Sequence, residues 1–118
     1  MPKLLVLLAL AGAGQALPPS ALGPHATSAR FIAAVNRADF RTACAMYSRR
    51  YLKATQAECR ALYRQGLALY GPYRYEELSS QTLPTHHYRV AISRRGKAAG
   101  YLEFASERGG WKLIHGGW

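Results

Sequence analysis

The apolar pattern of this chain changes its period once, at Gly71-Pro72. Before this pair, apolar residues recur every three or four positions, which is typical of amphipathic helices. After it, apolar and polar residues alternate, which is typical of strands with one buried face. A chain that forms helices first and strands afterwards is expected to bury both sets as an α+β layer structure.

The helical half of the sequence predicts three helices, each with its own starting signal. Thr27 or Ser28 is expected to cap the first helix, and Asp39 the second. Thr55 and Glu58 have the capping-box spacing, with a hydroxyl at the cap and a carboxylate three residues on, so they open the third helix.

The second half predicts four strands, over residues 73–83, 87–93, 100–105 and 111–115. Short turns separate them, so an antiparallel meander is expected, with three helices packed on a curved, cone-like sheet. Alternation assigns one set of side chains to the helix-facing side: Tyr88, Val90, Ile92, Leu102, Phe104, Trp111 and Leu113. His115 is expected on the same face as Trp111 and Leu113.

The first sixteen residues have the composition of a signal peptide. Lys3 supplies a basic start, an apolar run extends from Leu4 to Ala11, and small residues follow through Ala16. The run is shorter than the roughly 20 residues a membrane span needs. The prediction is a signal peptide over residues 1–16, a flexible leader over 17–26 and a single domain over 27–118. The mature protein would be secreted, periplasmic or in the cell envelope, without a membrane span.

Cys44 and Cys59 are the two cysteines of the chain. An even cysteine count in an exported protein predicts a disulfide. If one of the two cysteines were a catalytic thiol, the other would be left without a partner. A zinc site with His86, His87 or His115 would lack paired ligand spacing on each side. No metal or other cofactor is therefore expected.

Two stretches resemble small secreted bacterial domains of the nuclear transport factor 2-like superfamily, the cystatin-like cone and SnoaL-like group. They are Phe31-Ile-Ala-Ala-Val-Asn-Arg-Ala-Asp-Phe-Arg-Thr-Ala-Cys and the closing Gly-Gly-Trp-Lys-Leu-Ile. The resemblance covers residues 28–116. It implies a curved sheet wrapped around helices to form a cone with a pocket. Members include isomerases, dehydratases, polyketide cyclases and domains without activity, so the fold alone names no function.

The resemblance places a pocket between the helices and the inner sheet face, for a small hydrophobic or aromatic ligand. Tyrosines and tryptophan combine apolar area with polar tips, which suits such a site. The expected wall residues are Tyr47, Tyr51, Tyr63, Tyr88, Trp111 and His115.

Catalytic candidates are few. His115 and His87 are the histidines that a strand would position for proton transfer near neutral pH. The single aspartate, Asp39, fits a helix cap rather than a pocket acid. The leading hypothesis is therefore a non-catalytic exported domain that binds a small ligand or an envelope partner. The alternative is a cyclase, isomerase or dehydratase that uses a pocket histidine.

Charge supplies a third hypothesis. The chain has 16 Lys and Arg against 6 Asp and Glu, a net charge of +10. Such an excess favours anionic partners, for example an envelope polymer. Nucleic acid is the less accessible partner for an exported protein. A polyanion-binding surface would need one contiguous basic face, whereas the arginines are scattered along the sequence from Arg30 to Arg108.

Overall fold

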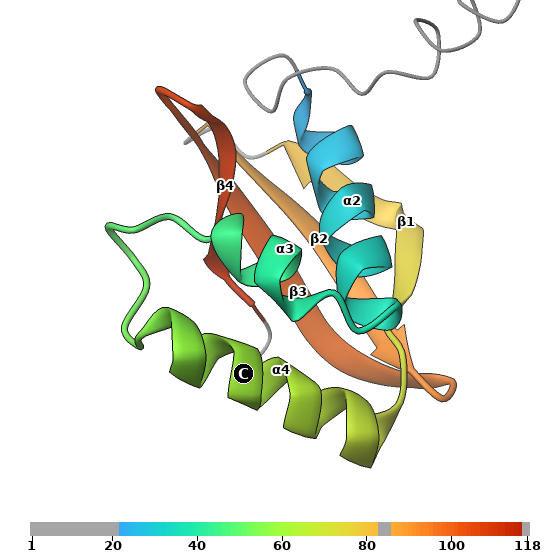
Figure 1. Cartoon of the computed structure of the whole chain (residues 1–118). Coiled ribbons are helices and arrows are strands. Elements are labelled where there is room, and N and C mark those ends of the chain that lie inside the picture. Colours follow the sequence, from blue (N-terminus) through green and yellow to red (C-terminus); the bar gives the residue numbers. More distant parts are fainter. Residues whose placement is uncertain (1–21, 83–85, 117–118) are drawn as a thin grey trace, which may run out of the picture.

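The computed structural model describes residues 22–82 and 86–116. The predicted signal peptide and residues 17–21 of the predicted leader lie outside the described residues. Within them, three helices precede four strands (Figure 1). The elements are α2 (Pro24–Asn36), α3 (Phe40–Ala45), α4 (Gln56–Tyr70), β1 (Arg74–Thr82), β2 (His87–Arg94), β3 (Lys97–Glu107) and β4 (Gly110–His115).

The four strands form an antiparallel sheet in the order β1-β2-β3-β4, and the helices pack on one of its faces (Figure 1). The predicted α+β fold of three helices on a four-stranded meander is confirmed. The sheet is open, and no helix of the described residues packs on its second face. None of the helices in the described ranges is long and apolar enough to cross a membrane.

The core lies between the helices and the helix-facing side of the sheet. Phe31 and Val35 of α2 are fully buried and meet side chains from the central strands. The predicted inward set is confirmed: Tyr88, Val90, Ile92, Leu102, Phe104 and Leu113 are buried, and Trp111 packs half-buried against them. Burial alternates over residues 88–92 and 102–104 of the two central strands, which explains why the sequence predicts this set correctly.

The start of α2 differs from the prediction. The helix begins at Pro24, so residues 24–26 belong to it rather than to the leader. Proline is favoured at a first helical position because its φ is already helical and its missing N–H has no partner to lose there. Thr27 and Ser28 lie in the first turn instead of capping it, and their hydroxyls donate to the carbonyls of Gly23 and His25 at 2.8 and 2.9 Å.

The caps of the other two helices are confirmed. Asp39 precedes α3, and its carboxylate accepts a hydrogen bond from the Thr42 amide at 3.3 Å. Thr55 and Glu58 form a complete capping box at the start of α4, with bonds of 3.1 and 2.8 Å. These bonds satisfy amide groups that the first helical turn leaves without partners.

The predicted disulfide is confirmed: Cys44 in α3 and Cys59 in α4 are bridged, with 6.1 Å between their Cα atoms. Both cysteines are fully buried. The thiol and zinc alternatives are therefore wrong, because both sulfur atoms are used in the bridge.

The segment after α3 lies along β4, one of the two edge strands of the sheet. The Ser48 amide donates to the Leu113 carbonyl, and the Leu113 amide donates to the Met46 carbonyl, each at 2.9 Å. Tyr47 is thereby paired in parallel with β4. These two bonds occupy the backbone groups of Leu113, so this position of the edge no longer offers them to another chain.

Candidate ligand-binding site

The six residues predicted to wall one pocket lie in several places. Tyr47, Tyr51 and His115 line a common hollow of about 400 Å³, between the segment after α3 and the end of β4. Trp111 lines a different hollow, between α2, α3 and β4. Tyr63 is a buried residue of α4 that lines a third hollow, and Tyr88 is buried beside β1. Three of the six predicted wall residues, Tyr47, Tyr51 and His115, therefore line one hollow, and the other three do not.

A β-bulge decides where His115 lies. In the pairing of β3 with β4, Leu113 is opposite Phe104 but His115 is opposite Glu103, so Ile114 is an extra residue. Each extra residue moves the following side chain to the other face of the sheet. The imidazole accordingly stacks on Tyr101, with 4.5 Å between ring centroids. The prediction that His115 shares the face of Leu113 is wrong because alternation does not reveal a bulge.

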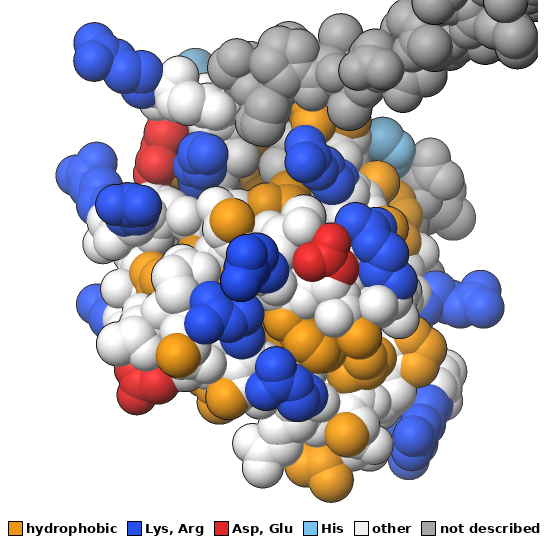
Figure 2. Space-filling model, in the orientation of Figure 1, with side chains coloured by type: hydrophobic (Ala, Val, Ile, Leu, Met, Phe, Trp, Pro, Cys, Tyr) orange, Lys and Arg blue, Asp and Glu red, His pale blue; other side chains and the backbone are white. Residues whose placement is uncertain are grey.

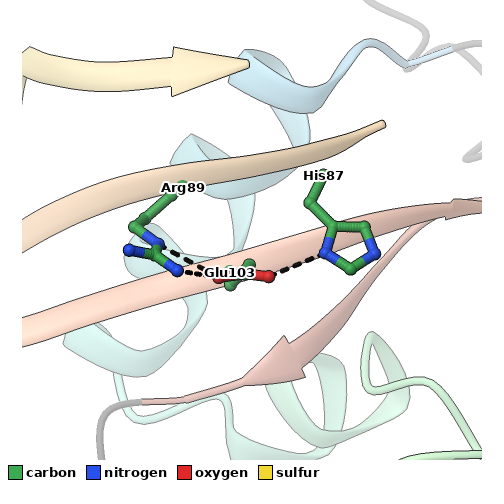
Figure 3. Close-up of polar contacts among 3 residues, drawn as sticks. All are labelled: His87, Arg89 and Glu103. Carbon is green, nitrogen blue, oxygen red and sulfur yellow. Dashed lines mark hydrogen bonds and ion pairs between the residues drawn. The ribbon is translucent and has the colours of Figure 1, made fainter. Parts of the chain in front are cut away.

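The sheet face without helices carries a connected polar cluster, which we call the outer-face cluster: His87, Arg89, Tyr101, Glu103 and His115. Figure 3 shows His87 and Arg89 on either side of Glu103. His87 Nδ1 lies 2.7 Å from one carboxylate oxygen. Arg89 Nε and Nη2 donate to the other at 3.0 and 2.8 Å. The Arg89 guanidinium also lies 4.2 Å from the centroid of the Tyr101 ring.

These contacts keep Glu103 ionised. Partial burial opposes the charge, but hydrogen bonds from Arg89 and His87 outweigh it, and the pKa of Glu103 falls below its ordinary value of 4.5. A carboxylate that accepts from a ring nitrogen fixes the orientation of the imidazole. His87 and Glu103 therefore have the geometry of an acid–base pair. Neither residue lines any of the five hollows found in the described part of the chain.

Two buried tyrosines have a structural role. The hydroxyls of Tyr47 and Tyr63 lie 2.9 Å apart, and Tyr63 also donates to the Gly116 carbonyl at 3.4 Å. Burial raises the pKa of each phenol, so both stay neutral. A side chain at Gly116 would overlap both hydroxyls. These tyrosines therefore join α4 and the segment after α3 to the end of the sheet.

His25 has partners that the sequence did not indicate. Its Nδ1 lies 2.7 Å from the Tyr75 hydroxyl and 3.4 Å from that of Tyr88. The two hydroxyls are 3.2 Å apart. His25 falls in the stretch predicted as a flexible leader, but the early start of α2 brings it into contact with β1 and β2. The wide separation of these residues in the sequence leaves no local signal for the contact.

The hollow between α2, α3 and β4 combines apolar walls with positive charge. It has a volume of about 250 Å³, and we call it the three-element hollow. Trp111, Met46 and Ala45 supply apolar surface. Arg30, Arg41 and Lys112 supply three cations, one from each element. None of these cations takes part in an ion pair with a residue in the described ranges. The remaining lining residues are Leu22, Thr27 and Thr42.

The described residues contain no group of three or more histidine, cysteine or acidic side chains that could hold a metal ion. No protein-family model matches this chain, and no curated protein matches it. The resemblance to the nuclear transport factor 2-like superfamily therefore stays a prediction.

Proposed function

We propose that this chain is an exported, non-catalytic domain of the nuclear transport factor 2-like superfamily that binds a small anionic ligand in the three-element hollow. One observation carries the proposal: Arg30, Arg41 and Lys112 converge on a hollow with an indole wall, and none of the three is in an ion pair with a described residue. Cations without a carboxylate partner, placed beside an apolar surface, suit a ligand with an anionic group and an apolar body.

The size of the hollow limits the ligand. Sites for drug-sized molecules run from roughly 300 to 1,000 Å³, and this one has about 250 Å³. We therefore expect a single ring or a short acyl chain bearing one carboxylate. Export is supported by the composition of residues 1–16 and by the Cys44–Cys59 bridge, since disulfides persist in oxidising compartments.

Tryptophan fluorescence tests the proposal. A Trp118→Phe background makes Trp111 the single tryptophan of the chain. Benzoate and octanoate should change its emission in a saturable way, whereas benzamide and octanol should bind more weakly. The double change Arg41→Gln with Lys112→Gln should weaken carboxylate binding at least tenfold, since each tenfold step corresponds to about 1.4 kcal/mol.

Arg74→Gln is the matched control, because Arg74 is exposed and lines none of the five hollows. It should leave binding unchanged. Equal affinity in wild type and in the Arg41/Lys112 double variant would refute the site. Binding lost in His115→Ala but kept in the double variant would refute it too, and would move the ligand to the hollow beside Tyr47 and Tyr51.

An acid–base enzyme is the second candidate function, and the His87–Glu103 contact of 2.7 Å favours it. Such an enzyme would need substrate to reach the imidazole on the sheet face without helices. Turnover of a carbonyl compound that is lost in His87→Gln but kept in the Arg41/Lys112 double variant would establish it. A polyanion surface is the third candidate; on the helical face, Figure 2 shows several Lys and Arg side chains near one another, with apolar and acidic side chains among them.

A further inference from the structure

A second binding surface lies along α4, and it shares no lining residue with the three-element hollow. Leu62, Leu69 and Tyr70 are 43, 56 and 58% exposed, and they are three of the four large apolar side chains exposed among the described residues. Leu62, Gly66 and Leu69 lie at spacings of four and three, so they form one stripe along the helix, and Tyr70 lies beside the end of this stripe. Figure 2 shows apolar side chains at the surface along the lower part of the helical face, where α4 runs.

Arg94 lies beside this stripe, in the gap that Gly66 leaves. A Cβ atom at Gly66 would lie 3.4 Å from Arg94 Nη2. The guanidinium packs 4.0 Å from the centroid of the Tyr73 ring and 5.7 Å from that of Tyr70. Its Nε is buried without a hydrogen-bond partner, and no carboxylate in the described ranges pairs with it. A buried donor without a partner is unfavourable, so this cation is held in place by packing rather than by an acid.

Two hollows of about 440 Å³ each meet at Tyr70 and Arg94. The first is lined by the apolar stripe and the second by Arg95 and Lys97. We call these two neighbouring hollows together the α4 groove; the exposed leucines line the first, and Arg95 and Lys97 line the second. An occupant that fills it must be long, and it must carry apolar groups next to acidic ones.

We propose that the α4 groove docks an acidic amphipathic segment of a partner protein, in which leucine-like side chains recur at every third or fourth position among glutamates or aspartates. Leu69 and Tyr70 are 56 and 58% exposed where they line the first hollow, which suits a polypeptide laid along the surface better than a small molecule that must be enclosed. Tyrosine and arginine are also among the residues enriched in the energetic hot spots of protein interfaces. A second copy of this chain is disfavoured because both copies would bring cations to the contact, and the chain has a net charge of +10.

Fluorescence anisotropy with labelled synthetic peptides tests this proposal. The probe is a 14-residue peptide with Leu at every third or fourth position and Glu at the others. Its comparators replace every Glu by Lys, or every Leu by Ser. At 150 mM salt, the Glu–Leu peptide should bind in a saturable way, and each comparator should bind at least tenfold more weakly.

Three variants and one matched control locate the site. Leu69→Ser and Arg94→Gln should each weaken binding of the Glu–Leu peptide at least tenfold, and Gly66→Leu should fill the groove and abolish it. Leu69 is exposed, so Leu69→Ser keeps the test valid if Arg94→Gln fails to fold. Arg64→Gln is the control, because it removes one charge from the same helix at a residue that lines neither hollow. It should leave binding unchanged.

Several results would overturn the docking proposal. These are no saturable binding of the Glu–Leu peptide, equal binding to Leu69→Ser and wild type, or equal binding of the peptide that lacks leucine. Self-association in sedimentation that Leu69→Ser abolishes would show that a second copy covers the stripe instead. Capture by anionic phospholipid vesicles that depends on Leu69, without peptide binding, would show a membrane surface in its place.

Discussion

Glu103 accepts three contacts on the sheet face opposite the helices, one from His87 and two from Arg89. The sequence predicts its side of the sheet correctly, since it alternates with the buried Leu102 and Phe104. Its partners follow from the register, because Arg89 is directly opposite Glu103 across the β2–β3 pair. A charged pair in this position is one of the contacts that stabilise neighbouring strands.

We expect the stability contributed by Glu103 to depend on pH. Its pKa in the folded protein lies below the ordinary value of 4.5, so the contribution is complete above about pH 4.5 and is lost as the pH falls through the folded value. Glu103→Gln should therefore be less stable than wild type at pH 7, and the difference should shrink steadily below pH 4.5. Urea unfolding at a series of pH values measures it, and a difference that grows on acidification would contradict the assignment.

At the scale of elements, the bridge between α3 and α4 is the strongest local constraint. The helix α3 has six residues, which is too short to be stable alone, so it depends on its contacts. The bridge ties it to α4, while Met46 and Ser48, just after it, hold the edge of β4. The loop that the bridge closes spans 15 positions.

Removing the bridge should destabilise the protein substantially. For the double variant Cys44→Ala with Cys59→Ala, we expect a loss of about 2–5 kcal/mol in the free energy of unfolding, since a loop of this length contributes about 3 kcal/mol in the chain-entropy model. Denaturant unfolding measures the loss, and the intact mass after alkylation confirms the bridge in wild type. A loss below about 0.5 kcal/mol would show that the bridge has no stabilising role.

At the scale of the whole molecule, positive charge outnumbers negative charge throughout. The chain carries 16 Lys and Arg against 6 Asp and Glu, and the described residues form three ion pairs. One of the six acids, Glu103, takes part in two of these pairs. Most of the cations therefore repel one another in the folded state. This repulsion acts over long distances, and salt screens it.

We expect the melting temperature to rise by a few degrees when sodium chloride is raised from 20 to 500 mM. Screening reduces the repulsion in the compact state more than in the expanded unfolded chain, and about 1 kcal/mol corresponds to roughly 4–8 °C for a domain of this size. Calorimetry measures the shift. A variant that replaces exposed arginines such as Arg74 by Gln should show a smaller rise, and a melting temperature that falls with salt would contradict the interpretation.

The order of the elements and most of the core were predictable from the sequence, because the signals are local. The caps at Asp39 and Thr55 act within three residues, and burial of Val90 or Leu102 follows from strand alternation. The disulfide was predictable because the chain has two cysteines and no paired metal-ligand spacing. The cap of α2 was placed at Thr27 or Ser28 instead of Gly23, four or five residues too late, since a proline can both end a leader and begin a helix.

The candidate sites were decided by the tertiary structure. The bulge at Ile114 turns His115 to the face without helices, and no residue in the sequence of β4 indicates that a bulge occurs there. Arg30, Arg41 and Lys112 are far apart in the sequence and meet because α2, α3 and β4 pack together. Arg94 fills the gap at Gly66 for the same reason. Sequence patterns determine what each element buries, whereas packing of distant elements determines which polar side chains meet.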